Sequence, residues 1–478
     1  MKARLLIAMS VALLAVLLPA CESEQEPRAQ RFGHYAEPTV DGLPSRALPG
    51  GETSYVSRHP GTHLALDAFA QPSANLAPAA RGLFAVGNAF FTQPWVQAPA
   101  STAARDGLGP LFNAAACQDC HLRDGRGHAP TSLDDPLTAA VVRIAGLDGR
   151  SHPVYGSQLQ TRAVPALAPE ARVGVDWRIT ESILPDGTRV ELRAPAITMS
   201  DWGYGEPSDI RLALRVPPPM IGVGLLEAIA ERDLEDEARR QSARPDGPRG
   251  RLNRATDRRS GETRIARFGW KAGQTTVEQQ VLHALFVDMG LTSDLFEQDV
   301  CTDSHTGCRE LPSGGDPEVS AQIAEALVFY SRHLAPPARR DHDRDDVLAG
   351  EALFADIGCA DCHRPSWTTA RVPDSEALSD QQIWPYTDLL LHDMGPDLAD
   401  GIVDGEAGGR DWRTAPLWGL GHTQTVSGAQ AGFLHDGRAR TLIEAILWHG
   451  GDAEAARRRW ANLRAQQRRQ VIRFLASL

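Results

Sequence analysis

Two five-residue segments place a pair of thiols beside an imidazole. Cys117-Gln-Asp-Cys-His121 and Cys359-Ala-Asp-Cys-His363 both have the form C-x-x-C-H. Two thiols at this spacing project from one turn of chain, and each can bond a vinyl group of one porphyrin whose iron the histidine then binds. The residues predicted to attach two c-type haems covalently are Cys117, Cys120, His121, Cys359, Cys362 and His363.

A single C-x-x-C-H motif is also compatible with chemistry that does not involve haem. A redox-active C-x-x-C followed by an unrelated histidine, or half of a zinc site, would show the same letters. Two copies in 478 residues favour haem attachment, and each follows a Leu-Phe pair, Leu111-Phe112 or Leu353-Phe354. The porphyrin would then perform the redox step, while the protein would set its axial ligands, its access and its local polarity.

The composition limits the classes of function. Hydrophobic residues make up 42% and charged residues 23% of the 478 residues, as in an ordinary globular chain of two or three domains. The net charge of −12 argues against a nucleic-acid binder and favours a basic redox partner.

The first 21 residues are typical of an export signal. Two basic residues, at positions 2 and 4, precede an apolar run over 5–18 that is too short to span a bilayer comfortably. Leu18-Pro-Ala-Cys21 resembles a bacterial lipobox, in which the cysteine carries lipid. We predict a lipoprotein-type signal peptide over 1–21 with lipidation at Cys21, and an ordinary cleaved signal is the alternative.

A polar lead-in follows the signal. Residues 22–60 are rich in Glu, Pro, Gly and Ser, which predicts a flexible tether. Position 22 is Glu instead of Asp, so nothing here signals retention in the inner membrane. We expect a periplasmic protein that is held to a membrane by lipid only, with the outer membrane favoured over the inner.

The remaining cysteines form a close pair. Cys301 and Cys308 are the two of the seven cysteines that belong neither to the haem motifs nor to the lipobox. In an oxidising compartment such a pair predicts a disulfide. A redox-active dithiol is the alternative, although nothing nearby in the sequence would lower a thiol pKa.

Helical and extended patterns indicate how the motifs are positioned. Apolar residues recur at three and four positions in 274–289 and 319–334, which predicts two amphipathic helices. We expect a helix with an acidic, solvated end over 225–239, and another over 347–357, directly before the second motif, with a C-terminal helix docked on it. Short Val/Ile/Leu runs broken by Gly, Pro and Asp predict hairpins and loops over 134–215.

An internal similarity suggests two units of common design. Pro219-Met-Ile-Gly-Val-Gly224 matches Pro416-Leu-Trp-Gly-Leu-Gly421, and each lies downstream of one haem motif. A charge run over 339–346, which follows two prolines, marks the expected boundary. We therefore predict a first haem domain over 61–338 and a second over 339–478.

Six further segments resemble a known family. They are Gly109–Cys117, Pro219–Glu227, Arg267–Lys271, Ile383–Gly395, Phe433–Arg438 and Trp448–Gly451. From about residue 80 to its end the chain resembles the bacterial dihaem oxidoreductases, also described as thiol oxidoreductases, which are relatives of the dihaem cytochrome c peroxidases. The resemblance implies a mainly α fold of two cytochrome c-like haem domains, the first enlarged by a loop- and β-rich insertion. It also implies electron transfer and peroxide chemistry.

One loop departs from the family pattern. Many relatives have an Asp/Gly-rich segment near 241–252 that could hold calcium. Here Pro245-Asp-Gly-Pro-Arg-Gly250 offers a single aspartate, so a calcium site at this loop is doubtful.

The sixth ligands decide which haem can react. For the second haem we predict Met394, 31 residues after His363, because a loop of that length can cross to the other face and a thioether raises the reduction potential. His392 and His435 are the rival ligands. For the first haem no clear sixth ligand emerges; Met220 lies in the segment that covers the distal face in relatives.

Other polar residues have predicted roles around the haems. The first haem is the predicted peroxidatic site, and Glu227 is then a candidate general acid–base for moving a proton between peroxide oxygens. The alternative for Glu227 is a solvated residue of an acidic helix. Arg215 and Arg413, one before each repeated segment, are candidate partners of haem propionates.

The leading hypothesis is an exported dihaem c-type cytochrome oxidoreductase of peroxidase type. It would take electrons from a small redox protein or another donor, pass them between its haems and reduce hydrogen peroxide or a related substrate. The alternatives are a non-catalytic dihaem electron-transfer protein and a thiol oxidoreductase that uses Cys301 and Cys308.

Overall fold

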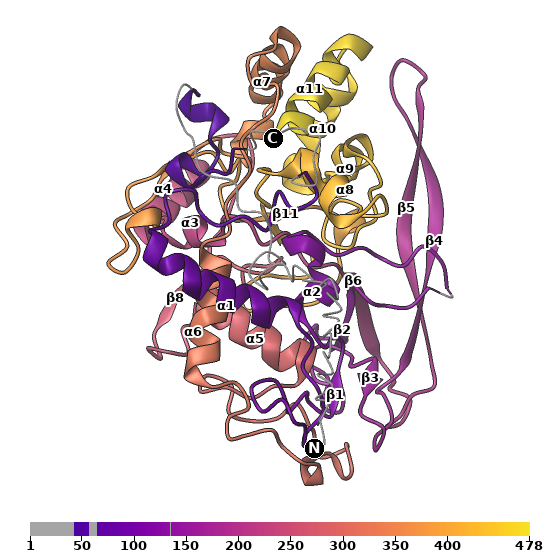
Figure 1. Cartoon of the computed structure of the whole chain (residues 1–478). Coiled ribbons are helices and arrows are strands. Elements are labelled where there is room, and N and C mark those ends of the chain that lie inside the picture. Colours follow the sequence, from indigo (N-terminus) through magenta and orange to yellow (C-terminus); the bar gives the residue numbers. More distant parts are fainter. Residues whose placement is uncertain (1–42, 57–64, 134) are drawn as a thin grey trace, which may run out of the picture. The chain divides into compact units, whose positions relative to one another are not determined.

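Two pairs of crossed helices organise the chain (Figure 1). The computed structural model describes residues 43–56, 65–133 and 135–478. Helix α1 (Arg81–Thr92) packs against α6 (Ala321–Arg332) in the first half of the chain. Helix α7 (Asp345–Asp356) packs against α11 (Ala465–Ser477) in the second half.

A glycine lies at each helix crossing. A Cβ atom added at Gly87 of α1 would lie 2.1 Å from the carbonyl oxygen of Ala326, and one at Gly350 of α7 would lie 2.0 Å from that of Gln470. Only glycine therefore lets the two backbones touch at these points. The same packing device occurs in both halves of the molecule.

Two of the other helices begin at a side-chain cap. Thr276 caps α5 (Val277–Met289), and Thr441 caps α9 (Leu442–Trp448), by accepting a backbone N–H three residues on. The helices expected over 274–289 and 319–334 are present as α5 and α6. The remaining helices are α2 (Cys117–Cys120), α3 (Val223–Glu227), α4 (Glu231–Ser242), α5 (Val277–Met289), α8 (Thr423–Ser427), α9 (Leu442–Trp448) and α10 (Glu454–Ala461).

The predicted mainly α fold class is wrong. Helices hold 31% and strands 17% of the described residues, and the strands form many small sheets instead of leaving two helical haem domains. The reason is that long segments between helices satisfy their buried backbone groups in antiparallel two-stranded ladders, outside the expected insertion as well as within it. The strands are β1 (Leu111–Phe112), β2 (Val141–Gly146), β3 (Arg162–Ala163), β4 (Arg172–Ile183), β5 (Arg189–Ser200), β6 (Ile210–Arg215), β7 (Asn253–Thr256), β8 (Thr263–Ala266), β9 (Trp367–Thr368), β10 (Gln382–Ile383), β11 (Leu391–Asp393) and β12 (Asp411–Arg413).

The longest ladder is a hairpin in the first half of the sequence that contacts the second half. Strands β4 and β5 pair from Arg172 with Ser200 to Ile183 with Arg189. Arg193 of β5 donates to the backbone carbonyls of Gly437 and Arg438, at 3.2 and 3.1 Å, so the hairpin is tied to the loop before α9. Figure 1 shows the hairpin beside α9 and α10.

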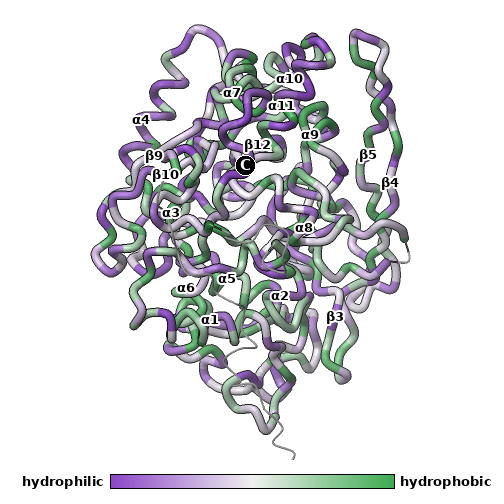
Figure 2. The backbone as a smooth tube through the Cα atoms, turned by 45° about the horizontal axis from the view of Figure 1, so that its top comes forward, coloured by the Kyte–Doolittle hydropathy of each residue, from purple (hydrophilic) through white to green (hydrophobic). Residues whose placement is uncertain are grey.

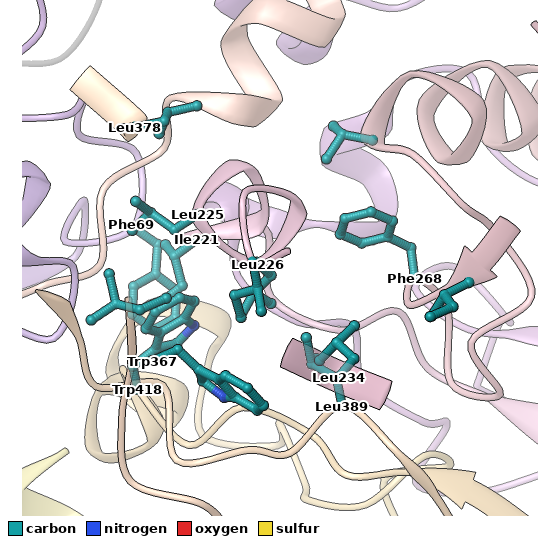
Figure 3. Close-up of a cluster of buried hydrophobic side chains, with 14 of the residues drawn as sticks. Phe69, Ile221, Leu225, Leu226, Leu234, Phe268, Trp367, Leu378, Leu389 and Trp418 are labelled. Atoms are coloured by element: carbon teal, nitrogen blue, oxygen red, sulfur yellow. The ribbon is translucent and has the colours of Figure 1, made fainter. Parts of the chain in front are cut away.

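A buried cluster brings the two repeated segments together. Ile221 and Trp418 belong to the same cluster, part of which is shown in Figure 3. Gly222 and Gly419, the first glycine of each repeat, both have φ +70°, which a residue with a Cβ adopts only with strain. A Cβ at Gly222 would lie 2.2 Å from the Trp418 ring. The repeats therefore face each other across this cluster.

The N-terminal part of the described chain is packed against the body. Residues 43–56 fall within the predicted tether, yet Ala47 and Tyr55 are buried, and the N–H of Tyr55 donates to the carbonyl of Pro336 at 2.9 Å. The predicted signal peptide, Cys21 and the rest of the tether lie outside the described residues. Among the described helices none is long and apolar enough to cross a membrane; α4 is strongly hydrophilic (Figure 2).

Candidate functional site

Both C-x-x-C-H motifs line one cavity. Its volume is about 900 Å³, and its walls include the thiols and imidazoles of both motifs. The four thiols are free. Burial, with smaller contributions from nearby charges, raises the pKa of Cys117 and of Cys359 to about 12, so both are neutral thiols. The tertiary structure thus brings together two motifs that lie more than 200 residues apart in the sequence.

The two motif histidines are held in the same way. The Nδ1–H of His121 donates to the carbonyl of Gly125 at 3.2 Å, and that of His363 donates to the carbonyl of Tyr386 at 2.9 Å. Burial lowers the pKa of each to about 4, so both rings are neutral. The carbonyl acceptor places the proton on Nδ1 and leaves the Nε2 lone pair for a metal.

An aromatic ring stands beside each of these imidazoles. Phe91 of α1 and Phe354 of α7 both lie 6.2 Å, centroid to centroid, from the nearby histidine ring. Each phenylalanine is four residues after the crossing glycine of its helix. The crossed helices therefore set the position of the ring that packs on the histidine.

Four arginines, buried or half-buried, line the cavity without a carboxylate partner among the described residues. Arg413 donates to the carbonyls of Gly269 and Thr414 at 3.0 and 3.1 Å. Burial lowers the pKa of both Arg126 and Arg413 to about 10, and the Nε of Arg126 has no hydrogen-bond acceptor within the described part of the chain. The four are Arg126, Arg143, Arg267 and Arg413, of which Arg267 already donates to the backbone carbonyls of Leu226, Glu227 and Ile229.

This arrangement fits haem. Buried guanidinium groups need anions, and the propionates of a porphyrin are carboxylates that Arg binds in bidentate fashion. Arg215, the other predicted propionate partner, also lines the cavity, but it already pairs with Asp400 at 2.6 Å. The paired thiols, the neutral imidazoles and the unpaired arginines together match the three chemical parts of a covalently held haem.

The candidates for the sixth ligand of the second haem differ in their surroundings. Met394 lines the cavity directly after β11. His392 has both nitrogens engaged, Nε2 with Asp388 at 2.9 Å and Nδ1 with Asp452 at 3.4 Å. His435 lies flat on Trp412 with ring centroids 3.6 Å apart. The structure therefore leaves Met394 accessible and holds His392 in an ionic network.

The first repeated segment, which begins at Pro219, contacts the loop that holds His121. Carbonyls of Gly125 and Pro218 both contact the His121 ring, and the N–H of Met220 donates to the Asp124 carbonyl at 2.9 Å. In the second half the N–H of Leu417 donates to the carbonyl of Pro385, the neighbour of the His363 acceptor. The backbone of Met220 is thus tied to the loop that supports His121, and Met220 also lines the cavity.

Glu227 is placed outside this cavity. Its carboxylate pairs with Arg332 at 2.6 Å and accepts the N–H of Val277 at 2.7 Å, at the start of α5. This carboxylate therefore joins three helices. Its predicted acid–base role stays a prediction that the placement does not favour.

Sequence reasoning missed two histidines that face the cavity. His283 lies on α5, and burial lowers its pKa to about 4, so the ring is neutral. Asp288 of the same helix raises the pKa of Cys117 and Cys120 after the larger effect of burial, which places α5 beside the first motif. His449 lies at the end of α9. In the sequence, His449 could have been found because it lies in Trp448–Gly451, one of the segments that resemble the family. His283 could not, because it has the pattern of any residue in an amphipathic helix.

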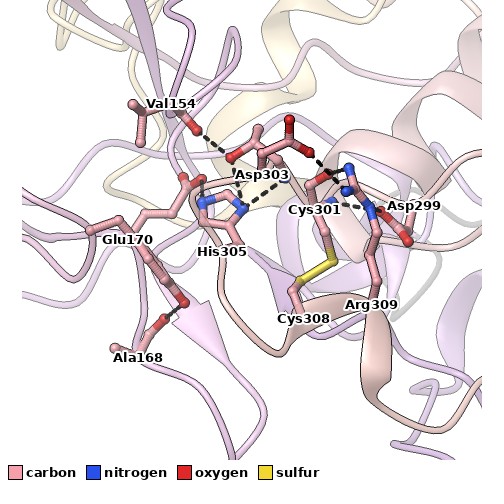
Figure 4. The surroundings of a disulfide bond; sticks show 11 residues. Val154, Ala168, Glu170, Asp299, Cys301, Asp303, His305, Cys308 and Arg309 are labelled. Carbon is pink, nitrogen blue, oxygen red and sulfur yellow. Dashed lines mark hydrogen bonds and ion pairs between the residues drawn. A yellow bond between two sulfur atoms is a disulfide. The ribbon is translucent and has the colours of Figure 1, made fainter.

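The Cys301–Cys308 pair is a disulfide outside the cavity (Figure 4). Both residues are buried, with 5% and 2% of their surface exposed. His305, between them in sequence, lies 3.1 Å from the carboxylate of Glu170. This bridge closes a loop that packs on Leu111 of β1, just before the first motif.

Comparison with family models adds an independent result. Residues 47–143 and 166–478 match the family described as "di-haem oxidoreductase, putative peroxidase". The chain belongs to the di-haem oxidoreductase family. The internal unmatched stretch of this di-haem oxidoreductase, 144–165, falls within the hairpin and loop region expected over 134–215. The two motifs and the residues around their histidines fall within the matched ranges.

Two other comparisons add no functional argument. A search of curated proteins finds no match. Among solved structures, a hydrazine synthase of Kuenenia stuttgartiensis is 13% identical and covers 83% of this chain and 92% of its own, with a TM-score of 0.28. A likeness that weak does not bear on the fold or the activity of this di-haem oxidoreductase.

Proposed function

We propose that this di-haem oxidoreductase binds two c-type haems covalently, one through each C-x-x-C-H motif, and reduces hydrogen peroxide or a related substrate. The observation that carries the proposal is the shared cavity, whose wall holds both motif histidines, each next to a pair of free thiols. The family match supports haem and oxidoreductase chemistry.

The side chains around the cavity would divide the work. When bound, haem would supply one-electron redox chemistry and a centre at which peroxide can react. Arg126 and Arg413 would hold propionates. His283, neutral and facing the cavity from α5, would accept and return a proton, while the guanidinium of Arg143 nearby lowers the pKa of that ring further.

The electron donor is proposed to be a small redox protein that docks near the second motif. From residue 454 to the end the chain has seven Arg and one Glu, although the whole chain carries −12. Arg458 and Arg459 of α10 are exposed, and the charge of Arg459 reaches Cys359. This local charge favours an acidic donor over the basic one that the net charge suggested.

The cellular context is also a proposal. The apolar run over 5–18 and the lipobox-like Cys21 support export, lipidation and a periplasmic location with the outer membrane favoured. Cys301 and Cys308 lie in a buried disulfide, which gives the thiol-oxidoreductase alternative no accessible thiol.

Mass spectrometry tests the proposal first. The mature protein, made in a host with a cytochrome c maturation system, should carry the added mass of two haems that survives denaturation. Stopped-flow mixing of the half-reduced protein with hydrogen peroxide should then give oxidation of haem and turnover with an added electron donor. A mass without haem, or two haems that never react with peroxide, would overturn the binding and the activity respectively.

A further inference from the structure

One face of α9 lies along the cavity beside the second motif. Leu442, Ala445, Ile446 and His449 all line it, at positions i, i+3, i+4 and i+7. This spacing puts the four side chains on one side of a helix. The first three are apolar, so the imidazole at the C-terminal end is the polar group that this face offers to a ligand.

The imidazole of His449 is prepared for metal binding. Its Nδ1–H donates to the carbonyl of Ala445 at 2.7 Å, which repeats the arrangement at His121 and His363. Among the described residues Nε2 has no hydrogen-bond partner. A carbonyl acceptor on one nitrogen fixes the tautomer that leaves the other free to bind a metal.

The position of His449 suits the second haem. His449 and His363 both line this cavity. Leu447 of α9, two residues before His449, shares a buried cluster with Phe354, the ring that packs on His363. The helix that carries His449 is therefore packed into the same half of the cavity.

The rival side chains are less suited. His392 is committed to Asp388 and Asp452 through both nitrogens. The ring of His435 is stacked on Trp412, which fixes its plane. Met394 remains as the alternative, because its side chain reaches the same cavity.

We propose that His449, through Nε2, is the second axial ligand of the iron that His363 binds. The proposal rests on the proposed function, because it requires a haem at Cys359 and Cys362. Two imidazoles would make this haem six-coordinate and give it a lower reduction potential than a histidine–methionine pair would. Binding of external ligands would then be restricted to the first haem.

The test compares His449→Ala and Met394→Leu in the full-length haem-loaded protein. Electron paramagnetic resonance and resonance Raman spectra should show a bis-imidazole low-spin haem in the wild type. H449A should convert that haem to a high-spin form that binds cyanide, and added imidazole should restore the low-spin signal. M394L should leave the spectrum unchanged, as should the control His342→Ala, which lies outside the cavity.

A second variant sharpens the result. His449→Met should keep a six-coordinate haem but raise its midpoint potential in a redox titration. If H449A does not accumulate, the wild-type spectrum alone decides, because a histidine–methionine signature at the second haem would overturn the assignment. An unchanged low-spin signal in H449A, with loss of that signal in M394L, would do the same. Absence of covalent haem in the mass spectrum would instead overturn the proposed function.

Discussion

The two halves of the cavity share a scaffold and differ in the charges around it. In both, a phenylalanine four residues after a crossing glycine packs 6.2 Å from the motif histidine, whose Nδ1–H donates to a carbonyl. Near the first motif the thiol of Cys120 lies 3.7 Å from the neutral carbonyl of Thr138. Near the second, Cys362 lies 3.7 Å from His392, which two aspartates flank.

The residues that would hold each haem differ from those that would set its reduction potential. The repeated features position a thiol pair and an imidazole, and any haem held this way needs them. The features that differ set local charge and the second axial position, which control reduction potential and access. The functional difference between the two halves is therefore expected to reside in the side chains that are not repeated.

Removal of one motif at a time should have the largest effect. Cys117→Ser with Cys120→Ser should leave one covalent haem and abolish peroxide turnover, because the proposed reactive site is lost. Cys359→Ser with Cys362→Ser should also leave one haem and block electron entry. Mass spectrometry and pyridine haemochrome spectra measure the haem content. Two covalent haems in either double variant would contradict the assignment of one haem to each motif.

The next largest effect is expected from breaking the ion pair between Asp388 and His392, which lies beside Cys362. Burial alone would raise the pKa of Asp388 and lower that of His392, but their mutual attraction reverses both shifts. Asp388→Asn leaves a buried imidazolium with one distant partner and should lower the free energy of unfolding by about 3–5 kcal/mol. Denaturant unfolding of the haem-loaded protein measures it.

The pH dependence of that loss has a defined sign. The raised pKa of His392 gives stability that is present below its ordinary value of 6.5 and is lost as pH rises through the folded value. The lowered pKa of Asp388 gives stability present above 3.8 and lost in acid. The difference between wild type and D388N should thus be largest between these values. Asp393→Asn, which breaks an exposed pair with Arg410, should cost less than about 1 kcal/mol.

The proton-transfer residue of the first half can be identified by a paired substitution. His283→Gln should lower peroxide turnover by about 100-fold, which is in the usual range for a positioned acid–base group. Glu227→Gln should leave turnover within about twofold and lower stability by about 1 kcal/mol, since it weakens a partly exposed pair with Arg332. The reverse order of rates would restore the acid–base role of Glu227. Steady-state kinetics and thermal unfolding provide the two measurements.

The shared scaffold can be tested at its glycines. Gly87→Ala and Gly350→Ala each put a methyl group against a backbone carbonyl and should cost about 1–3 kcal/mol, by similar amounts in the two halves. Gly82→Ala, on the exposed side of α1 with nothing within 4 Å, should stabilise the helix by about 1 kcal/mol or less. Chemical denaturation compares the three. A harmless change at one crossing would show that the halves do not share this packing.

Much of the site was visible in the sequence because its chemistry is local. Two thiols and an imidazole within five residues need no tertiary contact to be recognised, and the repeated P-h-h-G-h-G segments (h, apolar) indicated two related halves. Apolar periodicity likewise predicted α5 and α6. The helix expected over 225–239 is split into α3 and α4, because Arg267 binds the carbonyls of Leu226 and Ile229 and ends the first.

The sequence by itself determined the two attachment motifs, the family and the long helices, because each depends on residues close together in the chain. Only the tertiary structure decided that the motifs share one cavity, that Glu227 lies outside it, and that His283 and His449 lie on it. It also decided the fold class, since the strands form where backbone groups of distant segments must satisfy each other. Those contacts join residues far apart in the chain, and no local pattern of residue types records them.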